Sequence, residues 1–120
     1  MTRAGGAAAR ETLDALAAAL RRAVGDAVER EALALGDEAK RRCPADAGTL
    51  RESIRARVRI AGDTAEAVIG SDLPYAAKAE LGALSTPPEP YLAPALDARR
   101  SAIGERIGQA VRGVLEGNKP

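Results

Sequence analysis

The sequence contains no histidine, no phenylalanine and no tryptophan, and it has a single cysteine, Cys43. The absence of histidine excludes Ser-His-Asp and Cys-His catalytic centres and the usual zinc sites. A lone cysteine excludes an internal disulfide and any metal site made of several cysteines. The sequence also lacks a glycine-rich phosphate loop and an acidic cluster spaced for a metal ion. We therefore expect a protein that is not an enzyme and that holds no cofactor.

Targeting and membrane-spanning segments are also missing. No positively charged segment followed by a long apolar run opens the sequence, which argues against a signal peptide. No window approaches the ~20 apolar residues that cross a bilayer. The protein is expected to be made and kept in the cytoplasm. Cys43, which precedes Pro44 at a predicted helix end, is expected to be a small buried core residue and not a reactive thiol.

Bulky apolar residues are scarce. Hydrophobic residues make up 46% of the chain, but 28 of them are alanine. Burying an alanine yields far less free energy than the roughly 1.5–3 kcal/mol of a leucine, isoleucine or valine side chain. A chain of 120 residues is expected to form one domain, residues 1–120, with one core. Because that core is thin for a free-standing domain, the composition predicts a subunit that completes its burial against copies of itself.

The central part of the sequence predicts a β-hairpin. From Ser53 to Ala61 apolar and polar residues alternate strictly, with arginine at every second position. A period of two is typical of a strand with one buried and one solvated face. Gly62-Asp63 suits a tight turn, and Thr64–Ile69 then alternates again. We expect an antiparallel hairpin with an exposed arginine face, and the rest of the chain packed on its other face.

A long helix is predicted before the hairpin. Apolar residues recur at spacings of three and four from Leu13 to Ala39, which indicates one apolar stripe on a helix from about Arg10 to Arg42. The basic last turn suits the helix dipole, and Pro44 ends the helix. Gly25 and Gly36 each cost about 1 kcal/mol in a helix interior, so the sequence allows a kink or break near either of them.

Three further helical segments are predicted. Thr49 and Glu52 have the spacing of a capping box, which starts a helical turn. Tyr75–Leu81 is a short helix stopped by the glycine that follows it. Ala83–Pro90 is a proline-rich loop that is expected to be extended, exposed and suited to contact with a neighbour. A last helix then starts at about Pro94.

These elements together predict an α+β fold. It consists of a long N-terminal helix, an antiparallel β-hairpin, a short middle helix and a C-terminal helix. Residues 1–9 and 116–120 are expected to be flexible because they are small, polar or rich in glycine.

Charge is unevenly distributed, although the net charge is only +1. Residues 40–59 carry seven basic and two acidic side chains, whereas residues 60–97 carry one basic and six acidic side chains. Blocks of opposite sign can be paired within the fold, meet between subunits, or form ordinary solvated faces.

The arginines of the predicted hairpin face are the candidate functional patch: Arg51, Arg55, Arg57 and Arg59. Arginines that alternate on a strand can follow phosphates, although stacking aromatics for bases are missing, so any contact with nucleic acid would be non-specific. The alternative is a solvated strand face that pairs with acids such as Glu66. A small DNA-binding protein that uses the basic block 40–59 is the rival hypothesis.

Three short segments, CPADAGTLRESI, PYAAKAELG and PEPYLAPALD, follow the predicted long helix in this order. With that helix, the ordered set resembles the gene-product-ten family of tailed-phage head–tail connector proteins, also called neck or tail-completion proteins, over roughly residues 10–115. The matching positions are Pro44, Asp46, Gly48, Leu50 and Ser53, then Tyr75, Ala76, Glu80 and Gly82, and then Pro90, Tyr91, Leu92, Pro94, Ala95 and Leu96. The chain departs from the family pattern at Ala47, Lys78, Leu81 and Ala83.

The resemblance implies a structural virion protein at the neck of a phage, prophage or gene transfer agent. Such a protein forms a ring of identical copies, usually with sixfold symmetry, around the DNA channel between capsid and tail. Its partners would be copies of itself and the adjacent adaptor, stopper, tail terminator or tail tube, with non-specific contact to packaged DNA and none to a membrane. A terminator or stopper of the same neck is the nearest alternative. In this reading Arg55 or Arg57 lines the channel or a subunit interface, and the matched positions are structural.

Overall fold

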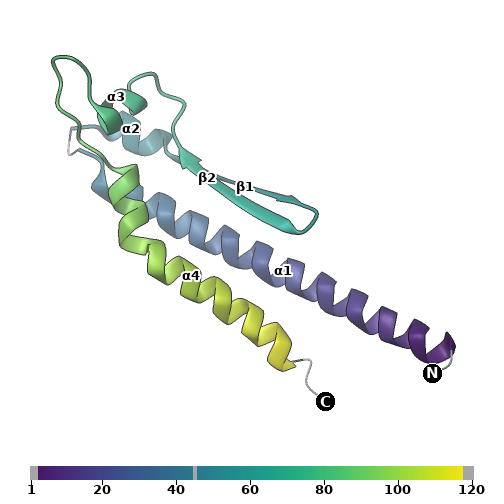
Figure 1. Cartoon of the computed structure of the whole chain (residues 1–120). Coiled ribbons are helices and arrows are strands. Elements are labelled where there is room, and N and C mark those ends of the chain that lie inside the picture. The colour runs from purple at the N-terminus through teal and green to yellow at the C-terminus, as the bar shows by residue number, and fades with distance from the viewer. Residues whose placement is uncertain (1–2, 45, 118–120) are drawn as a thin grey trace.

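The computed structural model describes residues 3–44 and 46–117, which form an elongated molecule measuring 73 × 22 × 21 Å. Two long helices run side by side in opposite directions, and a hairpin lies along the first of them (Figure 1). Two short helices sit at the end of the molecule where the first long helix finishes, and we call this end the head. The elements, in chain order, are α1 (Arg3–Arg42), α2 (Gly48–Ser53), β1 (Arg55–Ala61), β2 (Thr64–Gly70), α3 (Ala76–Leu81) and α4 (Leu92–Gly117). The predicted α+β fold is confirmed.

Helix α1 is continuous through Gly25 and Gly36, so neither glycine interrupts it. It begins at Arg3, before the predicted start near Arg10, and residues 6–15 are exposed beyond the hairpin. Gly25 and Gly36 are both buried. A Cβ atom at Gly25 would lie 2.8 Å from Cδ1 of Ile60, so the glycine lets the hairpin approach the helix closely. The missing side chains therefore improve packing instead of bending the helix.

The hairpin forms as the alternation predicts. Strands β1 and β2 pair antiparallel, and Ala61 pairs with Thr64 across a tight turn. Gly62 has a φ of 57°, a left-handed conformation that glycine adopts without steric cost. The half-buried residues Ala56 and Val58 of β1 alternate with exposed arginines, and one face of the hairpin covers α1. None of the residues of β1 and β2 is fully buried, because a two-stranded sheet packed on one long helix keeps its other face in contact with solvent.

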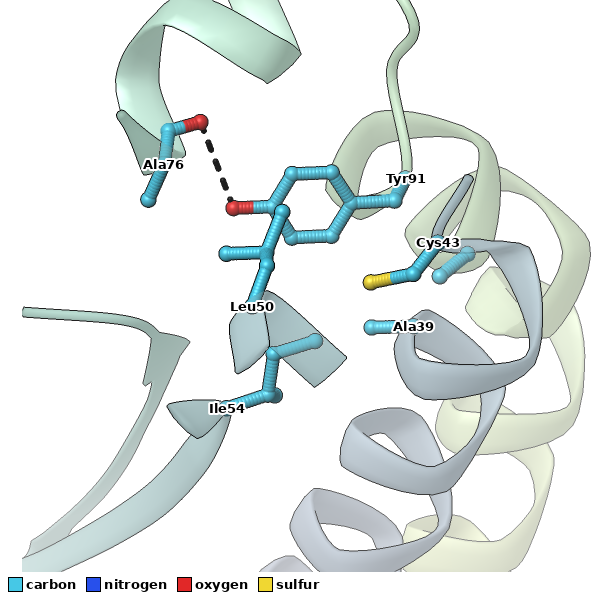
Figure 2. Close-up of a cluster of buried hydrophobic side chains, with 7 residues drawn as sticks. Ala39, Cys43, Leu50, Ile54, Ala76 and Tyr91 are labelled. Carbon is cyan, nitrogen blue, oxygen red and sulfur yellow. Dashed lines mark hydrogen bonds between the residues drawn. The ribbon is translucent and has the colours of Figure 1, made fainter. Parts of the chain in front are cut away.

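The densest core lies in the head, where α1, α2, α3 and α4 converge. Figure 2 shows Tyr91 pointing into this cluster, with its hydroxyl donating a hydrogen bond of 3.4 Å to the carbonyl oxygen of Ala76. Cys43 is one of its buried members, as predicted. The buried residues are Ala39, Cys43, Leu50, Ile54, Ala76, Tyr91 and Ala95. A single aromatic ring thus fills the space among several small side chains.

The capping box predicted at Thr49 is wrong. Helix α2 begins at Gly48 with Ala47 in the capping position, and no side chain makes the cap hydrogen bond. Thr49 is exposed inside the helix. Leu50, the residue expected to anchor this turn, is fully buried. The amide of Ala47 donates a hydrogen bond of 3.0 Å to the carbonyl of Pro44, which closes a turn just before α2. This turn and the burial of Leu50 stabilise the start of α2 in place of a side-chain cap.

Helices α1 and α4 meet through a buried charge as well as through apolar side chains. Glu31 of α1 is buried, with 7% of its surface accessible. One of its carboxylate oxygens lies 3.4 Å from Nη1 of Arg106 and 3.7 Å from Nη2 of Arg99, both on α4. Since one carboxylate faces two guanidinium groups, it fixes how α4 lies along α1.

The start of α1 and the end of α4 both point away from the head, and α1 extends farther than α4 (Figure 1). Residues 3–9 continue α1 and residues 116–117 continue α4. Residues 1–2 and 118–120 of the predicted flexible ends lie outside the described residues. Helix α4 begins at Leu92, slightly earlier than the predicted start at Pro94.

Candidate interaction surfaces

Three exposed features are candidates for contact with partners: the outer face of the hairpin, the loop after α3, and a groove beside β2. The first consists of Arg55, Arg57 and Arg59, which we call the arginine face. All three side chains project from β1 and are exposed, as the alternation predicts. The face points away from α1 because the alternate residues of β1 cover that helix.

Acidic neighbours partly neutralise the arginine face. Arg59 bonds Glu66, its cross-strand partner, at 3.2 Å, and Arg57 lies 3.6 Å from Asp72. Arg55 donates to the backbone carbonyl of Glu52 at 2.6 Å. Exposed pairs of this kind contribute only about 0–1 kcal/mol each, so they are easily exchanged for another anion. The hairpin therefore presents arginines that are ordered and accessible at the same time.

Arg51 does not belong to the arginine face, contrary to the prediction. It lies on α2, is half-buried and turns back to the end of α1. Its Nε donates to the carbonyl oxygen of Lys40 at 3.2 Å, and its Nη2 donates to that of Pro44 at 3.1 Å. Both carbonyls also accept a backbone amide, from Cys43 and Ala47 respectively, so Arg51 adds a second donor where α1 ends and helps to cap the helix.

The family-motif glutamate, Glu80, has a clear structural role. Its Oε1 accepts hydrogen bonds from the backbone amides of Tyr91 and Leu92 at 2.9 and 2.7 Å, and its Oε2 accepts one from Ala93 at 3.2 Å. The carboxylate therefore caps the start of α4 from the neighbouring helix α3. A negative charge at a helix start is also favoured by the helix dipole.

Several other family-motif residues also lie in the head and stabilise it. Leu50, Ala76, Tyr91 and Ala95 are buried in its core. The hydroxyl of Ser53 hydrogen-bonds that of Ser71 and so joins α2 to the segment after the hairpin. The remaining motif positions are exposed or half-buried around this core: Pro44, Asp46, Gly48, Tyr75, Gly82, Pro90, Leu92, Pro94 and Leu96.

Gly82 is needed for the loop that follows it. Its φ is 80°, and a Cβ atom there would lie 3.0 Å from both Cδ and the backbone nitrogen of Pro88. An alanine would therefore be strained in conformation and would press on backbone that cannot move away.

Burial changes the chemistry of two core groups. Burial raises the pKa of the Cys43 thiol, although the nearby Arg51 opposes this shift. Burial also raises the pKa of the Tyr91 hydroxyl. Both groups stay protonated and uncharged near neutral pH, which fits structural positions and not a reactive nucleophile.

The last residue of α3 and the turn that follows it form an exposed, uncharged tip, which we define as Leu81–Thr86 and call the apolar tip. Ala83 and Thr86 exchange two backbone hydrogen bonds of 2.9 and 3.1 Å, so this part of the predicted extended loop is a tight turn. Leu84 stands at its end with a relative accessibility of 110%, and Leu81 has one of 77%. Figure 1 shows the loop projecting outward from the head.

A groove lies between β2, α1 and the first turns of α4. Its wall is entirely uncharged, with Val68 and Leu96 exposed at its rim. We call it the uncharged groove, and its lining residues are Leu35, Ala39, Ala67, Val68, Ile69, Leu92, Ala93, Ala95 and Leu96. Three other grooves each include charged side chains: Arg21 and Asp63 near the hairpin turn, Glu29 beside β1, and Asp46, Lys78 and Glu89 in the head.

Sequence reasoning missed Glu31, the groove and the tight turn of the tip. The signal for Glu31 is present in hindsight, because it lies on the apolar face of α1 between the buried residues Ala27 and Ala32. Arg99 and Arg106 are seven residues apart and therefore share one face of α4. The groove arises from the packing of three elements that are distant in the sequence.

Within residues 3–44 and 46–117, no helix is both long and apolar enough to cross a membrane.

The model of one protein family, described as "Bacteriophage HK97-gp10, putative tail-component", matches residues 7–82. The match therefore runs from α1 through the hairpin to the end of α3. No curated protein and no solved structure matches the chain.

Proposed function

The chain belongs to the HK97-gp10-like family of phage tail components, and from this premise we propose that it is a structural subunit of the phage neck. In this proposal it is a head–tail connector or tail-completion protein that forms a ring of identical copies around the DNA channel. Its role is to join neighbouring proteins and not to catalyse a reaction. The proposed location is the virion, at the junction of capsid and tail, after assembly in the host cytoplasm.

The observation that carries the proposal is the excess of exposed surface. The chain exposes 8298 Å², whereas a compact monomer of this mass exposes about 6,100 Å². Its radius of gyration is 20.0 Å, compared with about 14 Å for a compact domain of this length. An interface of standard size buries about 800 Å² on each partner. The excess of about 2,200 Å² is therefore large enough for the roughly 1,600 Å² that two such interfaces would cover on one subunit.

Two interfaces per subunit are what a closed ring of identical copies requires. In a head-to-tail ring, each subunit uses one surface toward the copy before it and a different surface toward the copy after it. The exposed tip of the head and the groove beside β2 lie on different parts of the molecule, as such a ring needs. The sixfold copy number and the adjacent partners (adaptor, stopper, terminator or tail tube) belong to the same proposal.

The arginine face suits a wall of the DNA channel or a subunit interface. Arg57 and Arg59 are exposed and weakly paired, so both remain available to phosphates or to acidic side chains of a neighbour. Contact with packaged DNA would be non-specific, because phosphate contacts carry no sequence information. Arg51 is not proposed for this wall, because its guanidinium group donates hydrogen bonds to two backbone carbonyls where α1 ends.

A tail terminator or stopper of the same neck is the second candidate, because the family is one of tail components and the excess surface suits any of these rings. Cryo-electron microscopy of a phage, prophage particle or gene transfer agent that carries this protein would test the proposal. We expect a ring of copies between capsid and tail, with Arg55 or Arg57 on the lumen or at a subunit interface. A ring placed at the tail end would favour the terminator, and single scattered copies would contradict the ring.

A further inference from the structure

We propose that the apolar tip of one subunit inserts into the uncharged groove of a second copy of this chain. This inference rests on the proposed ring and names the two surfaces that would form its repeating contact. The tip supplies Leu84 and Leu81, and the groove supplies the apolar walls of β2, α1 and α4.

The tip has the properties of a preformed insertion element. Its turn is closed by the two backbone hydrogen bonds between Ala83 and Thr86, and the amide of Glu89 donates to the carbonyl of Ala79 at 2.8 Å to hold the base of the loop. Gly82 packs against Pro88 at the same base. A turn that is already ordered loses little conformational entropy when it binds. Leu84 is therefore exposed to water on a turn that backbone hydrogen bonds close.

The uncharged groove is the one whose chemistry suits insertion of the apolar tip. Residues 81–88 carry no charged side chain, so burying the tip desolvates no ion. The other three grooves described above contain carboxylates, a lysine or an arginine, which would lose hydration against a leucine side chain. The uncharged groove presents alanine, leucine, isoleucine and valine and has a volume of about 380 Å³. It can therefore accept a leucine side chain without an unpaired charge on either side.

The excess of exposed surface favours a second copy of this chain as the occupant of the groove. The chain exposes about 2,200 Å² more than a compact monomer. Its own tip does not fill its own groove, because Leu84 is fully exposed and Val68 and Leu96 are exposed at the rim. Because tip and groove are different surfaces, the contact is head-to-tail and repeats from copy to copy.

Directed cross-linking of the full chain would test this contact. Leu84→Cys and Leu96→Cys variants, one of them isotopically labelled, are mixed and oxidised, and cross-linked pairs are identified by mass. Cys43 is buried and is left in place. The matched control replaces Leu96→Cys by Leu115→Cys, since Leu115 is 45% exposed near the other end of α4. We expect labelled–unlabelled pairs between positions 84 and 96, and at least about tenfold fewer between 84 and 115, because proximity sets the yield.

Sedimentation of the uncross-linked chain separates failure of this contact from failure of the ring. Leu84→Ser is expected to weaken self-association about tenfold or more, and Leu115→Ser to leave it unchanged, because a leucine is buried only at the first site. If the chain associates but positions 84 and 96 do not cross-link above the control, the tip-in-groove contact is wrong and the ring stands. A chain that stays monomeric even at about 1 mM, where weak contacts are populated, contradicts both proposals.

Discussion

Glu80 shows at the scale of one residue how the head is held together. Its carboxylate reaches from α3 to the three amides at the start of α4, which have no acceptor of their own. Arg51 does the converse at the end of α1, where it donates to two carbonyls. Single charged side chains thus satisfy the open helix ends that meet in a small core.

Replacing Glu80 by alanine is expected to lower the free energy of unfolding by about 2–3 kcal/mol, because three charge-assisted hydrogen bonds at a helix start are lost. Glu80→Gln should cost less, about 1–2 kcal/mol, since one amide oxygen still accepts. Urea denaturation followed by circular dichroism measures both values. Glu105→Ala, at an exposed position of α4, is the control and should change stability by less than about 0.5 kcal/mol. Equal losses at positions 80 and 105 would contradict the capping role.

The burial of Cys43 and Tyr91 leads us to expect a lower free energy of unfolding at alkaline pH. Burial raises the pKa of each group in the folded state. Above its ordinary pKa, about 8.5 for cysteine and about 10 for tyrosine, the unfolded chain loses a proton that the folded chain keeps. The unfolded state then binds fewer protons, so the free energy of unfolding decreases as pH rises.

We therefore expect urea denaturation to give a constant stability up to about pH 8 and a decline that begins near pH 8.5. Cys43→Ala is the informative variant, because it removes the thiol and should flatten the first part of this decline, whatever its effect on stability at neutral pH. A decline of the same slope in the variant would show that the thiol does not cause it.

At the scale of elements, the hairpin and the two long helices were predictable because their signals are local. Alternation fixes β1 and β2, Gly62 fixes the turn, and the three-and-four spacing fixes α1. Residues whose partners come from distant elements were not predictable in this way. Thr49 has capping-box spacing but is exposed, and Arg51 continues the arginine alternation but turns toward α1.

The candidate site was predictable only in part for the same reason. Exposure of Arg55, Arg57 and Arg59 follows from the period of a strand. The role of Glu80 required the position of α4, and the family pattern alone gave the residue without its contacts. The uncharged groove depends on how three elements pack, which no local pattern encodes. Leu84 lies in a proline-rich loop, and its complete exposure depends on the turn between Ala83 and Thr86.

The contact between α1 and α4 should depend strongly on Glu31. Glu31→Gln is expected to destabilise the chain by about 1–3 kcal/mol, less than the 3–5 kcal/mol of a fully buried pair. The reason for the smaller value is that the side chain of Arg106 remains 54% exposed and can be hydrated. Arg99 has only 19% of its side chain exposed and loses its acidic partner. Hydrogen exchange should show faster exchange in α4 than in the head.

Glu29→Gln is the control for this prediction, because Glu29 is exposed on the same helix. A double variant, Glu31→Met with Arg99→Met, should recover part of the loss, since two apolar side chains of similar length leave neither an unpaired carboxylate nor an unpaired Arg99. A recovery would identify the charge and not the lost packing as the cause. If Glu31→Gln and Glu29→Gln were equally stable, the buried pair would not hold α4.

At the scale of the whole molecule, shape and charge together separate a neck subunit from a free-standing DNA-binding protein. The basic block 40–59 looks continuous in the sequence, but the fold disperses it. Arg41 and Arg42 pair with Glu38 on α1, and Arg51 caps that helix. Of the described basic side chains in this block, Arg55, Arg57 and Arg59 are the three that project together from one strand. A single copy therefore has few phosphate contacts to offer, whereas a ring would repeat them around a channel.

The salt dependence of DNA binding by the isolated chain tests this difference. If only the three arginines of the face contact phosphates, log K against log salt should have a slope no steeper than about −3 for duplex DNA. A DNA-binding protein that used all seven basic residues of the block would give about −6. Fluorescence anisotropy at several salt concentrations measures the slope. Replacing Arg55, Arg57 and Arg59 by glutamine should abolish the remaining slope, and Arg100→Gln with Arg112→Gln, on exposed positions of α4, should not. A steep slope that persists without the arginine face would favour the DNA-binding rival and place the contact elsewhere on the chain.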